Sequence, residues 1–152
     1  MKRFIGNIDA KADAKGRVFV PAAFRKILNE LEEDQLVLRK DIYQDCLILY
    51  PFHIWNEELD NLRLKLNKWN ETHQALYRQF ILDSEKLELE INGRVLIPKR
   101  YLQMVGISSE VRFVGMDQTI EIWSRSKLES SLLTPEEFEK NVRKFLGGSS
   151  DE

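Results

Sequence analysis

Apolar and polar positions follow the same short pattern in two separate parts of the chain. Residues 17–20 and 94–97 each consist of an arginine and three apolar residues, and short runs of this kind predict buried strands. Pro21 and Pro98 end these runs, and because proline suits the first position of a helix, a short helix is predicted after each. Further apolar runs predict a hairpin in each part, over 36–39 with 46–50 and over 110–114 with 119–123.

The two parts are copies of one unit of strand, turn, strand, short helix and hairpin. The stretch DAKGRVFVP at 13–21 returns as EINGRVLIP at 90–98, 77 residues later. The likeness resumes at an offset of 73, where LILY at 47–50 matches IEIW at 120–123. A repeated supersecondary unit is typical of a duplicated fold. We therefore expect a first unit over 4–54 and a second unit over 81–128.

A helical connector is predicted between the two units, over 55–80. Eight positions follow the 4-3-4-3 spacing of a helix seam, and they are Trp55, Leu59, Leu62, Leu66, Trp69, His73, Leu76 and Phe80. A break near 70–72 would divide this stretch into a helical pair. Two interpretations stay open, because the seam can cover the core of its own chain or be buried against a neighbouring subunit.

The segment 129–152 is predicted to hold a short C-terminal helix and a frayed tail. Thr134-Pro135-Glu136-Glu137 is a capping box with proline at the first helical position. An apolar stripe follows, formed by Phe138, Val142 and either Phe145 or Leu146, and Gly147-Gly148 is expected to end the helix. No chemistry is assigned to this segment.

Each unit carries a turn of the form acid-x-x-Gly-Arg. The turn residues are Asp13, Gly16 and Arg17 in the first copy and Glu90, Gly93 and Arg94 in the second. The acid can accept backbone N–H bonds in an Asx-type turn, and glycine permits the positive φ that tight turns often require. Glutamate forms such a turn less readily than aspartate, so the second turn is expected to differ from the first.

The charge of the chain is unevenly spread. A net charge of −2 by itself argues against nucleic-acid binding. Residues 1–26, however, hold seven basic and two acidic residues, a net +5, whereas the last 24 residues carry −3. Such asymmetry suggests one face for a polyanion. Lys15 and Arg17 bracket the glycine of the first turn, where lysine suits phosphate and arginine suits the O6 and N7 atoms of guanine.

Five basic residues are therefore candidates for DNA contact, namely Arg17, Lys15, Arg3, Lys2 and Lys11. The last three lie within reach of the turn if the first strand pairs with the strand after Arg17. The alternative is that Arg17 is structural and pairs with Asp13 to brace the turn. Arg94 is expected mainly to hold the geometry of its turn or of a subunit contact, with direct DNA contact as the alternative.

The sequence contains no recognised motif for catalysis or for a cofactor. One cysteine, Cys46, and two histidines, His53 and His73, exclude an internal disulfide and a finger-type zinc site. We expect Cys46 in the core, His53 on the surface and His73 on the helix seam. No catalytic residue, cofactor, metal or small-molecule substrate is predicted. Because no apolar run reaches the roughly 18 residues of a membrane span, we expect a cytoplasmic protein.

The sequence resembles the MraZ family, bacterial transcriptional regulators of the division and cell-wall gene cluster. The resemblance covers about residues 4–128 and rests on the first turn motif with Val20-Pro21 and Phe24-Arg25, on Leu49-Tyr50-Pro51 followed by Trp55, and on GRVLIP at 93–98 and EIW at 121–123. It implies an α+β fold of two tandem, intertwined SpoVT-AbrB-like small β-barrel units related by a pseudo-twofold. It also implies that the arginine of the first loop belongs to the DNA-contacting face.

The resemblance further implies a sequence-specific repressor, associated with the nucleoid, that binds short direct repeats in double-stranded promoter DNA as a ring of identical subunits. One +5 patch makes only about three or four phosphate contacts, too few for selective binding at physiological salt. Several copies must therefore act together. The alternative is an oligomeric scaffold or protein-interaction module without direct DNA binding, in which the basic loop serves assembly.

Overall fold

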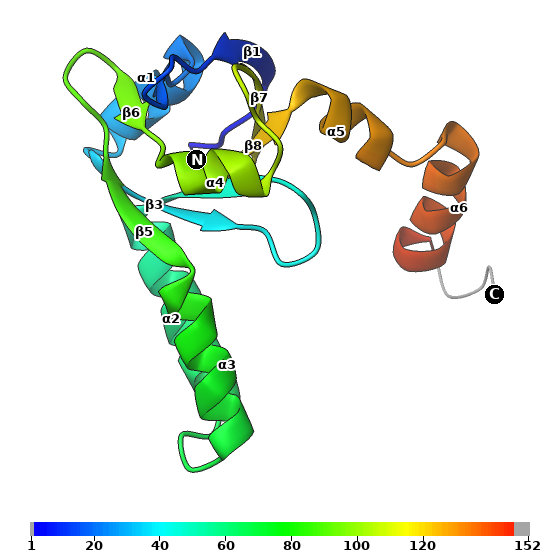
Figure 1. Ribbon diagram of the computed structural model, residues 1–152. Helices are drawn as coiled ribbons and strands as arrows, with labels where there is room; N and C mark the ends of the chain where they lie inside the picture. The colour runs from blue at the N-terminus through cyan, green and yellow to red at the C-terminus, as the bar shows by residue number, and fades with distance from the viewer. Residues whose placement is uncertain (1, 148–152) are drawn as a thin grey trace.

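The computed structural model describes residues 2–147 and contains eight strands and six helices in that range (Figure 1). In chain order they are β1 (Asn7–Lys11), β2 (Arg17–Phe19), α1 (Ala22–Glu30), β3 (Gln35–Lys40), β4 (Leu47–Pro51), α2 (Phe52–Lys65), α3 (Glu71–Leu82), β5 (Ser84–Glu88), β6 (Arg94–Leu96), α4 (Lys99–Met104), β7 (Glu110–Met116), β8 (Thr119–Ser124), α5 (Arg125–Ser131) and α6 (Pro135–Leu146). The predicted hairpins are β3–β4 and β7–β8, and the helices predicted after Pro21 and Pro98 are α1 and α4.

The strands of the two copies are interleaved. Six strands form one antiparallel sheet in the order β1-β7-β8-β4-β3-β5, and β2 pairs with β6 in a separate two-stranded ribbon. Four pairings join the copies, because β1 pairs with β7, β4 with β8, β3 with β5 and β2 with β6. The predicted α+β fold of two intertwined units is confirmed. The predicted pairing of β1 with β2 is wrong, since one isolated bridge, Ala12 with Val18, joins these segments.

The core lies between the sheet, the ribbon and the short helices α1 and α4. Equivalent positions of the two copies fill it, with Phe24 of α1 and Tyr101 of α4 both buried, and with Val18 and Val95 below the ribbon. Phe4, ahead of β1, packs edge-on against Phe24 at a ring separation of 5.8 Å. The duplicated sequence therefore places its repeated apolar positions in one shared core.

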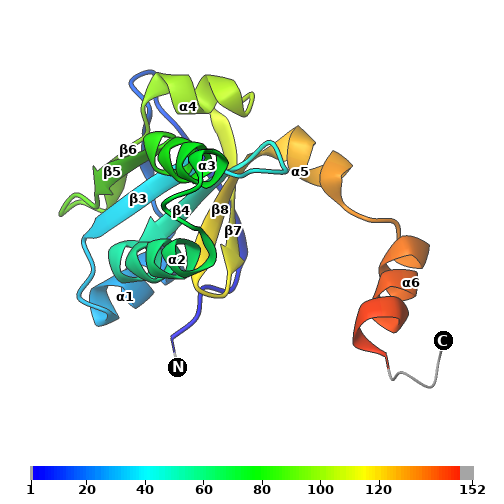
Figure 2. The same cartoon turned by 90° about the horizontal axis from the view of Figure 1, so that it is seen from below.

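The connector is a helical hairpin that projects from the sheet (Figures 1 and 2). Trp55 of α2 stacks on Phe80 of α3, with ring centroids 5.6 Å apart and planes 5° apart. The buried Arg39 of β3 lies 4.1 Å over the Phe80 ring and donates from Nε to the Phe80 carbonyl oxygen at 3.1 Å. Leu59 and Leu62 pack against this cluster. These contacts attach the base of the hairpin to β3 and β4.

The chain reverses direction between α2 and α3, so the predicted seam is not continuous. Asn70 caps α3 by accepting from the His73 N–H at 3.1 Å, and His73 Nδ1 accepts from the Asn67 N–H at 2.9 Å. Trp69 lies in this turn and is 84 % exposed, whereas Leu66 is half-buried. The seam spacing therefore describes packing inside the chain for Trp55, but not for Trp69.

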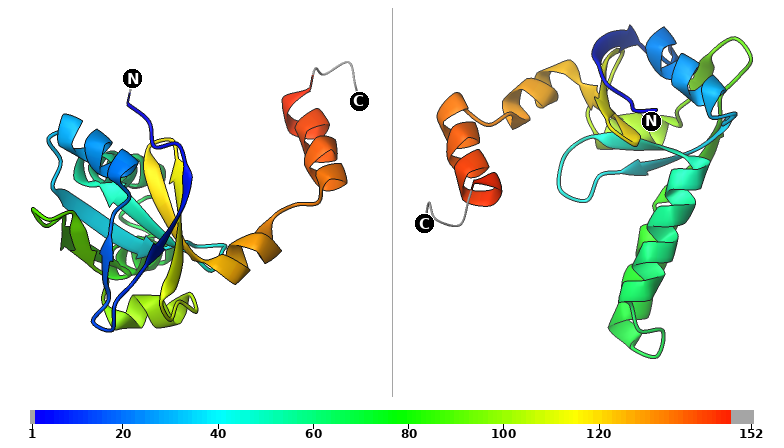
Figure 3. Two further views of the ribbon diagram at one scale, coloured as in Figure 1. Left: turned by 90° about the horizontal axis from the view of Figure 1, so that it is seen from above. Right: turned by 180° about the vertical axis from the view of Figure 1, so that it is seen from behind.

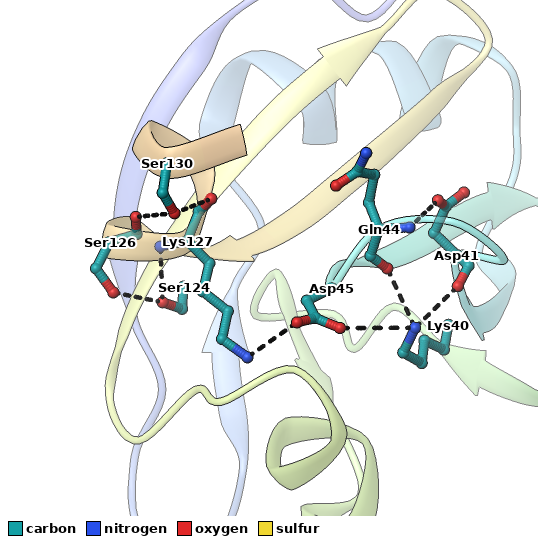
Figure 4. A network of polar contacts seen from close by, with 8 residues as sticks. All are labelled: Lys40, Asp41, Gln44, Asp45, Ser124, Ser126, Lys127 and Ser130. Carbon is teal, nitrogen blue, oxygen red and sulfur yellow. Dashed lines mark hydrogen bonds and ion pairs between the residues drawn. The ribbon is translucent and has the colours of Figure 1, made fainter. Parts of the chain in front are cut away.

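The helix α5 was not predicted, and it is fixed to the loop between β3 and β4. Its Lys127 Nζ lies 3.3 Å from Asp45 Oδ2, while Lys40 Nζ lies 3.9 Å from Asp45 Oδ1 (Figure 4). On its inner side Leu128 packs against Trp123 and the buried Cys46. Both sides of α5 are therefore held by the body of the molecule.

The helix α6 forms as predicted but stands apart from the sheet in every view (Figures 1 to 3). Thr134 Oγ1 accepts from the Glu137 N–H at 3.1 Å, and Glu137 Oε1 accepts from the Thr134 N–H at 3.0 Å, which completes the capping box. Gly147 follows the helix, and the predicted tail from Ser149 lies outside the described residues. Within residues 2–147 every helix is too short or too polar to cross a bilayer.

Candidate nucleic-acid interface

The first Gly–Arg turn is held by one carboxylate. The backbone N–H groups of Lys15 and Arg17 both donate to Asp13 Oδ1 at 2.9 Å, and Gly16 adopts a φ of +91°. The Arg17 N–H bond, more than any other contact, holds the pKa of Asp13 below its usual value. The predicted Asx-type turn is thus present, and it fixes the backbone from which Lys15 and Arg17 project.

Arg17 is braced by this turn and still reaches solvent. Its Nε donates to Asp13 Oδ2 at 2.7 Å, and its side chain is 36 % exposed. The structural pairing that the sequence left open is therefore formed. A guanidinium has five N–H donors in a fixed fork, so one bond to Asp13 orients the group and leaves its terminal nitrogens available to another acceptor.

The second turn has the same backbone hydrogen bond as the first, but its acidic residue holds its arginine differently. The Gly93 N–H donates to the Glu90 carbonyl at 2.8 Å, as the Gly16 N–H does to Asp13 at 3.0 Å. The longer Glu90 side chain lies 3.6 Å from Arg94 Nε without a hydrogen bond, and Asn92 Oδ1 accepts from the Arg94 N–H at 3.2 Å instead. The expected difference between aspartate and glutamate is observed at this position.

The β2–β6 ribbon joins the two turns into one surface. Arg17 pairs with Leu96, Val18 with Val95, and Phe19 with Arg94. Because side chains alternate along a strand, the two buried valines leave a second face made by Arg17, Phe19, Arg94 and Leu96, which we call the ribbon face. Phe19 is 55 % exposed there and Leu96 48 %, and the Arg94 guanidinium carbon lies 5.7 Å from the centre of the Phe19 ring.

The pseudo-twofold puts each turn beside a helix of the other copy. The Ile97 N–H donates to the Gly16 carbonyl at 2.8 Å, and the Val20 N–H donates to the Gly93 carbonyl at 3.0 Å. Lys99 follows Ile97 and Pro98 at the exposed start of α4, and in Figure 3 the first turn lies next to this helix. Lys99 is thus a further cation beside the first turn.

The five predicted basic residues do not form one patch. Lys11 ends β1 and is exposed close to Lys15 and Arg17. Lys2 and Arg3 precede β1, so this strand of five residues, about 17 Å long, separates them from the turn. In Figure 3 the N-terminus and the first turn lie at opposite ends of the strand. There Lys2 Nζ lies 2.6 Å from Glu30 Oε2, and Arg3 Nη1 lies 3.3 Å from Asp117 Oδ1. The assumption that placed them near the turn was the wrong β1–β2 pairing.

Comparison with known proteins decides the family. A family model described as "MraZ protein, putative antitoxin-like" matches the chain twice, over 4–78 and 80–145. A protein of Bacteroides fragilis named transcriptional regulator MraZ is 58 % identical over 138 residues, 91 % of this chain and 87 % of its own. Its namesake from Phocaeicola vulgatus is 52 % identical over 149 residues, 98 % of this chain and 97 % of its own. This chain belongs to the MraZ family.

Membership of the MraZ family makes the chain a transcriptional regulator. Two titratable residues that the sequence singled out, Cys46 and His53, have partners in the packing or on the surface of the fold. Burial raises the pKa of the Cys46 thiol, and His53 Nδ1 lies 2.9 Å from Glu33 Oε2. Among residues 2–147 no three metal-binding side chains are grouped as a metal site would need.

Sequence reasoning missed two members of the ribbon face in this MraZ chain. Phe19 and Leu96 were assigned to buried strands because they stand in apolar runs. The signal that could have found them is alternation, since a strand of three residues with one buried valine exposes both of its neighbours. The pairing of β2 with β6, which brings Phe19 to Arg94, has no local signal in either copy.

Proposed function

We propose that this protein is a sequence-specific DNA-binding repressor of the division and cell-wall gene cluster. In this proposal it occupies short direct repeats in promoter DNA as a ring of identical subunits, associated with the nucleoid. The ribbon face carries the proposal, because a rigid two-stranded ribbon with an arginine at each end presents guanidinium groups to a double helix. A two-stranded ribbon is one of the elements that the major groove admits.

Arg17 is the principal DNA contact in this proposal, with Lys15, Lys11 and Lys99 directed at phosphates. The Asp13 brace supports the assignment, because a guanidinium that is already oriented loses less conformational freedom when it bonds guanine O6 and N7. Arg94 is braced less firmly and lies over Phe19, so we assign it a secondary contact. Lys2 and Arg3 contact DNA in this scheme only if the duplex extends along β1.

The proposal requires several subunits on one DNA. Head-to-tail contacts between subunits generate rings and present equivalent surfaces in one rotational direction, which matches direct repeats. Repeats one helical turn apart, about 10 bp, place successive ribbon faces on the same side of the duplex. Joining modest sites in this way raises the overall affinity by about 10²- to 10⁴-fold.

Binding of Arg17→Ala to the DNA upstream of the gene tests the proposal. Fluorescence anisotropy with labelled promoter DNA should show binding by the natural protein that weakens steeply with salt, and a loss of at least about 10-fold in Arg17→Ala, the loss of one bidentate base contact. Arg17→Lys should recover only part of the affinity. The matched control is Lys65→Ala, an exposed cation on α2, which should bind normally.

The exposed Phe19 and Leu96 favour the second candidate, a scaffold that binds a partner protein through the ribbon face. Apolar contacts depend little on salt, whereas counterion release makes DNA binding fall steeply as salt rises. If the natural protein shows no salt-sensitive binding to promoter DNA, or if Arg17→Ala binds as well as the natural protein, the DNA proposal is rejected and the scaffold function remains.

A further inference from the structure

The tips of the two Gly–Arg turns differ in chemistry although their backbones match. In both turns the acidic residue donates its N–H to the carbonyl of the arginine four positions later, at 2.9 Å in the first turn and 2.8 Å in the second. The two residues at the tip are Ala14 and Lys15 in the first turn, and Ile91 and Asn92 in the second. One turn therefore carries a cation at its tip, and the other carries an isoleucine and an amide.

Ile91 is fully exposed, and no other large apolar side chain within residues 2–147 is more exposed. Single apolar residues are common on protein surfaces, but Ile91 has apolar company. Its turn precedes β6 and lies at the end of the ribbon where the exposed Phe19 pairs with Arg94. Ile91 and Phe19 thus lie at one end of the ribbon that we propose faces DNA.

Cations also stand beside the second turn. The side chain of Arg25 lies against this turn, since a Cβ on Gly93 would be 2.4 Å from Arg25 Nη1. The next residue of α1, Lys26, is exposed. At the other end of the ribbon, Lys99 stands beside the first turn. Both ends therefore offer cations to the phosphates of a duplex, which position a protein without reading bases, so the difference between the ends lies at the two tips.

We propose that Ile91 recognises thymine by contacting its C5-methyl group in the major groove, while the first turn recognises guanine through Arg17. Thymine is the base that presents a methyl group in that groove, and apolar side chains recognise it there. Asn92 Oδ1 accepts from the Arg94 N–H at 3.2 Å, so Asn92 supports the turn and Ile91 makes the base contact. The inference rests on the proposed function, because it assigns a base to the second turn of the same ribbon.

The ribbon determines the spacing between the two base contacts. The turns lie at opposite ends of three residue pairs, from Arg17 with Leu96 to Phe19 with Arg94, which span about 10 Å. Base pairs of a duplex are about 3.4 Å apart along the axis. A ribbon that follows the groove therefore places the thymine at least about three base pairs from the guanine, close enough to belong to the same repeat.

Different tips also give the subunit a direction on the DNA. The pseudo-twofold exchanges the two turns, so two equivalent turns would recognise the same base at each end of the ribbon. Such a subunit could bind a repeat in either orientation. A direct repeat is bound in one orientation, which requires the two ends to prefer different bases, and the contrast between Lys15 and Ile91 at the tips supplies that preference.

Removing the methyl group from the DNA and the side chain from the protein tests the contact. The probe is the labelled promoter DNA, prepared with thymine or with uracil, which pairs in the same way but lacks the C5-methyl group. In anisotropy titrations the natural protein should bind the uracil DNA at least about 4-fold more weakly, the value of burying one methyl-sized group. Ile91→Ala should bind both DNAs with this weaker affinity, whereas Ile91→Val, which keeps two methyl groups, should retain most of the difference.

The controls separate this contact from the rest of the interface. Ile42→Ala removes another exposed isoleucine, in the loop between β3 and β4, and should distinguish the two DNAs like the natural protein. Arg17→Ala should weaken binding to both DNAs and keep the ratio of their affinities, because independent contacts add. The salt dependence of binding should become less steep in Arg17→Ala and stay unchanged in Ile91→Ala, since an apolar contact releases no counterions.

Two results would overturn the inference and leave the proposed function in place. They are equal binding of thymine and uracil DNA by the natural protein, and an Ile91→Ala variant that still prefers thymine DNA. A natural protein that binds neither DNA would reject the proposed function and this inference with it. Because Ile91 is fully exposed, circular dichroism should show that Ile91→Ala keeps the fold, so a loss of discrimination reports the contact itself.

Discussion

At the scale of single residues, the two turn glycines have the same conformation but different neighbours. Gly16 has a φ of +91° and Gly93 a φ of +90°, so alanine at either position carries left-handed strain of about 1–2 kcal/mol. A Cβ at position 16 would lie 2.2 Å from the backbone oxygen of Ile97, whereas a Cβ at 93 would meet Nη1 of Arg25 at 2.4 Å. The guanidinium can move aside and the backbone oxygen cannot.

Gly16→Ala should therefore destabilise the fold more than Gly93→Ala. We expect about 1–2 kcal/mol for Gly93→Ala and at least about 1 kcal/mol more for Gly16→Ala, because strand β6 must shift to relieve the clash. Urea unfolding of the two variants measures both free energies of unfolding. Equal losses of the free energy of unfolding in the two variants would show that backbone strain at positive φ, and not the contact with the Ile97 oxygen, determines the destabilisation.

The carboxylate of Asp13 makes the first turn sensitive to acid. Its pKa is lower in the folded chain than the ordinary value, chiefly because the Arg17 N–H donates to it. A lowered folded pKa means that the charged form stabilises the fold above the ordinary value near 4, and that this contribution is lost as the pH falls through the lowered folded pKa. Asp13→Asn should thus reduce the melting temperature at pH 7 and lose this difference in strong acid. Melting curves recorded at a series of pH values measure this difference in melting temperature, with Asp34→Asn as the control.

At the scale of elements, the hairpin depends on one of its two tryptophans. Trp55 is buried between Tyr50 and Phe80, while Trp69 is exposed in the turn. Trp55→Ala should reduce the free energy of unfolding by about 3–5 kcal/mol, the usual cost of removing a buried aromatic ring, and Trp69→Ala by less than about 0.5 kcal/mol. Urea unfolding of the two variants measures both losses. Comparable losses of the free energy of unfolding in the two variants would show that Trp69 also contributes to the packing of the hairpin.

The elements were predictable where their signals are local. Pro21 and Pro98 identified the starts of α1 and α4, and Thr134 identified α6, because a fixed φ or a capping box acts within one turn of helix. The partner of β1 was not predictable, since an amphipathic strand does not specify which distant strand it pairs with. The predicted β1–β2 hairpin was wrong for that reason, and the placement of Lys2 and Arg3 beside the turn depended on it.

The candidate site was predictable in part for the same reason. The acid-x-x-Gly-Arg pattern contains the whole first turn, including the bond between Asp13 and Arg17, because all its atoms come from five consecutive residues. The ribbon face takes Arg17 and Phe19 from one copy and Arg94 from the other, so it exists only after the copies interleave. Duplication in the sequence pointed to two units, whereas their intertwining was predicted only from the family resemblance.

At the scale of the whole molecule, the interleaved fold holds the ribbon face in a fixed position on the subunit. The ribbon face lies on the folded body, while α6 and the hairpin tip extend from it (Figure 1). Because Val20 after β2 and Ile97 after β6 donate to the turns of the opposite copies, a subunit held in the proposed ring presents its ribbon face at a fixed angle. A ring of such subunits can therefore read the rotational phase of DNA repeats, in addition to their sequence.

The spacing of DNA repeats should consequently control affinity. Adding about 5 bp between two repeats turns the second repeat by half a helical turn to the far side of the duplex, whereas adding about 10 bp restores its direction. The half-turn insertion should remove most of the roughly 10²- to 10⁴-fold gain from joined sites, and the full-turn insertion should keep more of it despite the greater distance. Anisotropy titrations with the two DNAs at equal salt measure this. Equal affinity for the two DNAs would contradict a ring that engages both repeats at once.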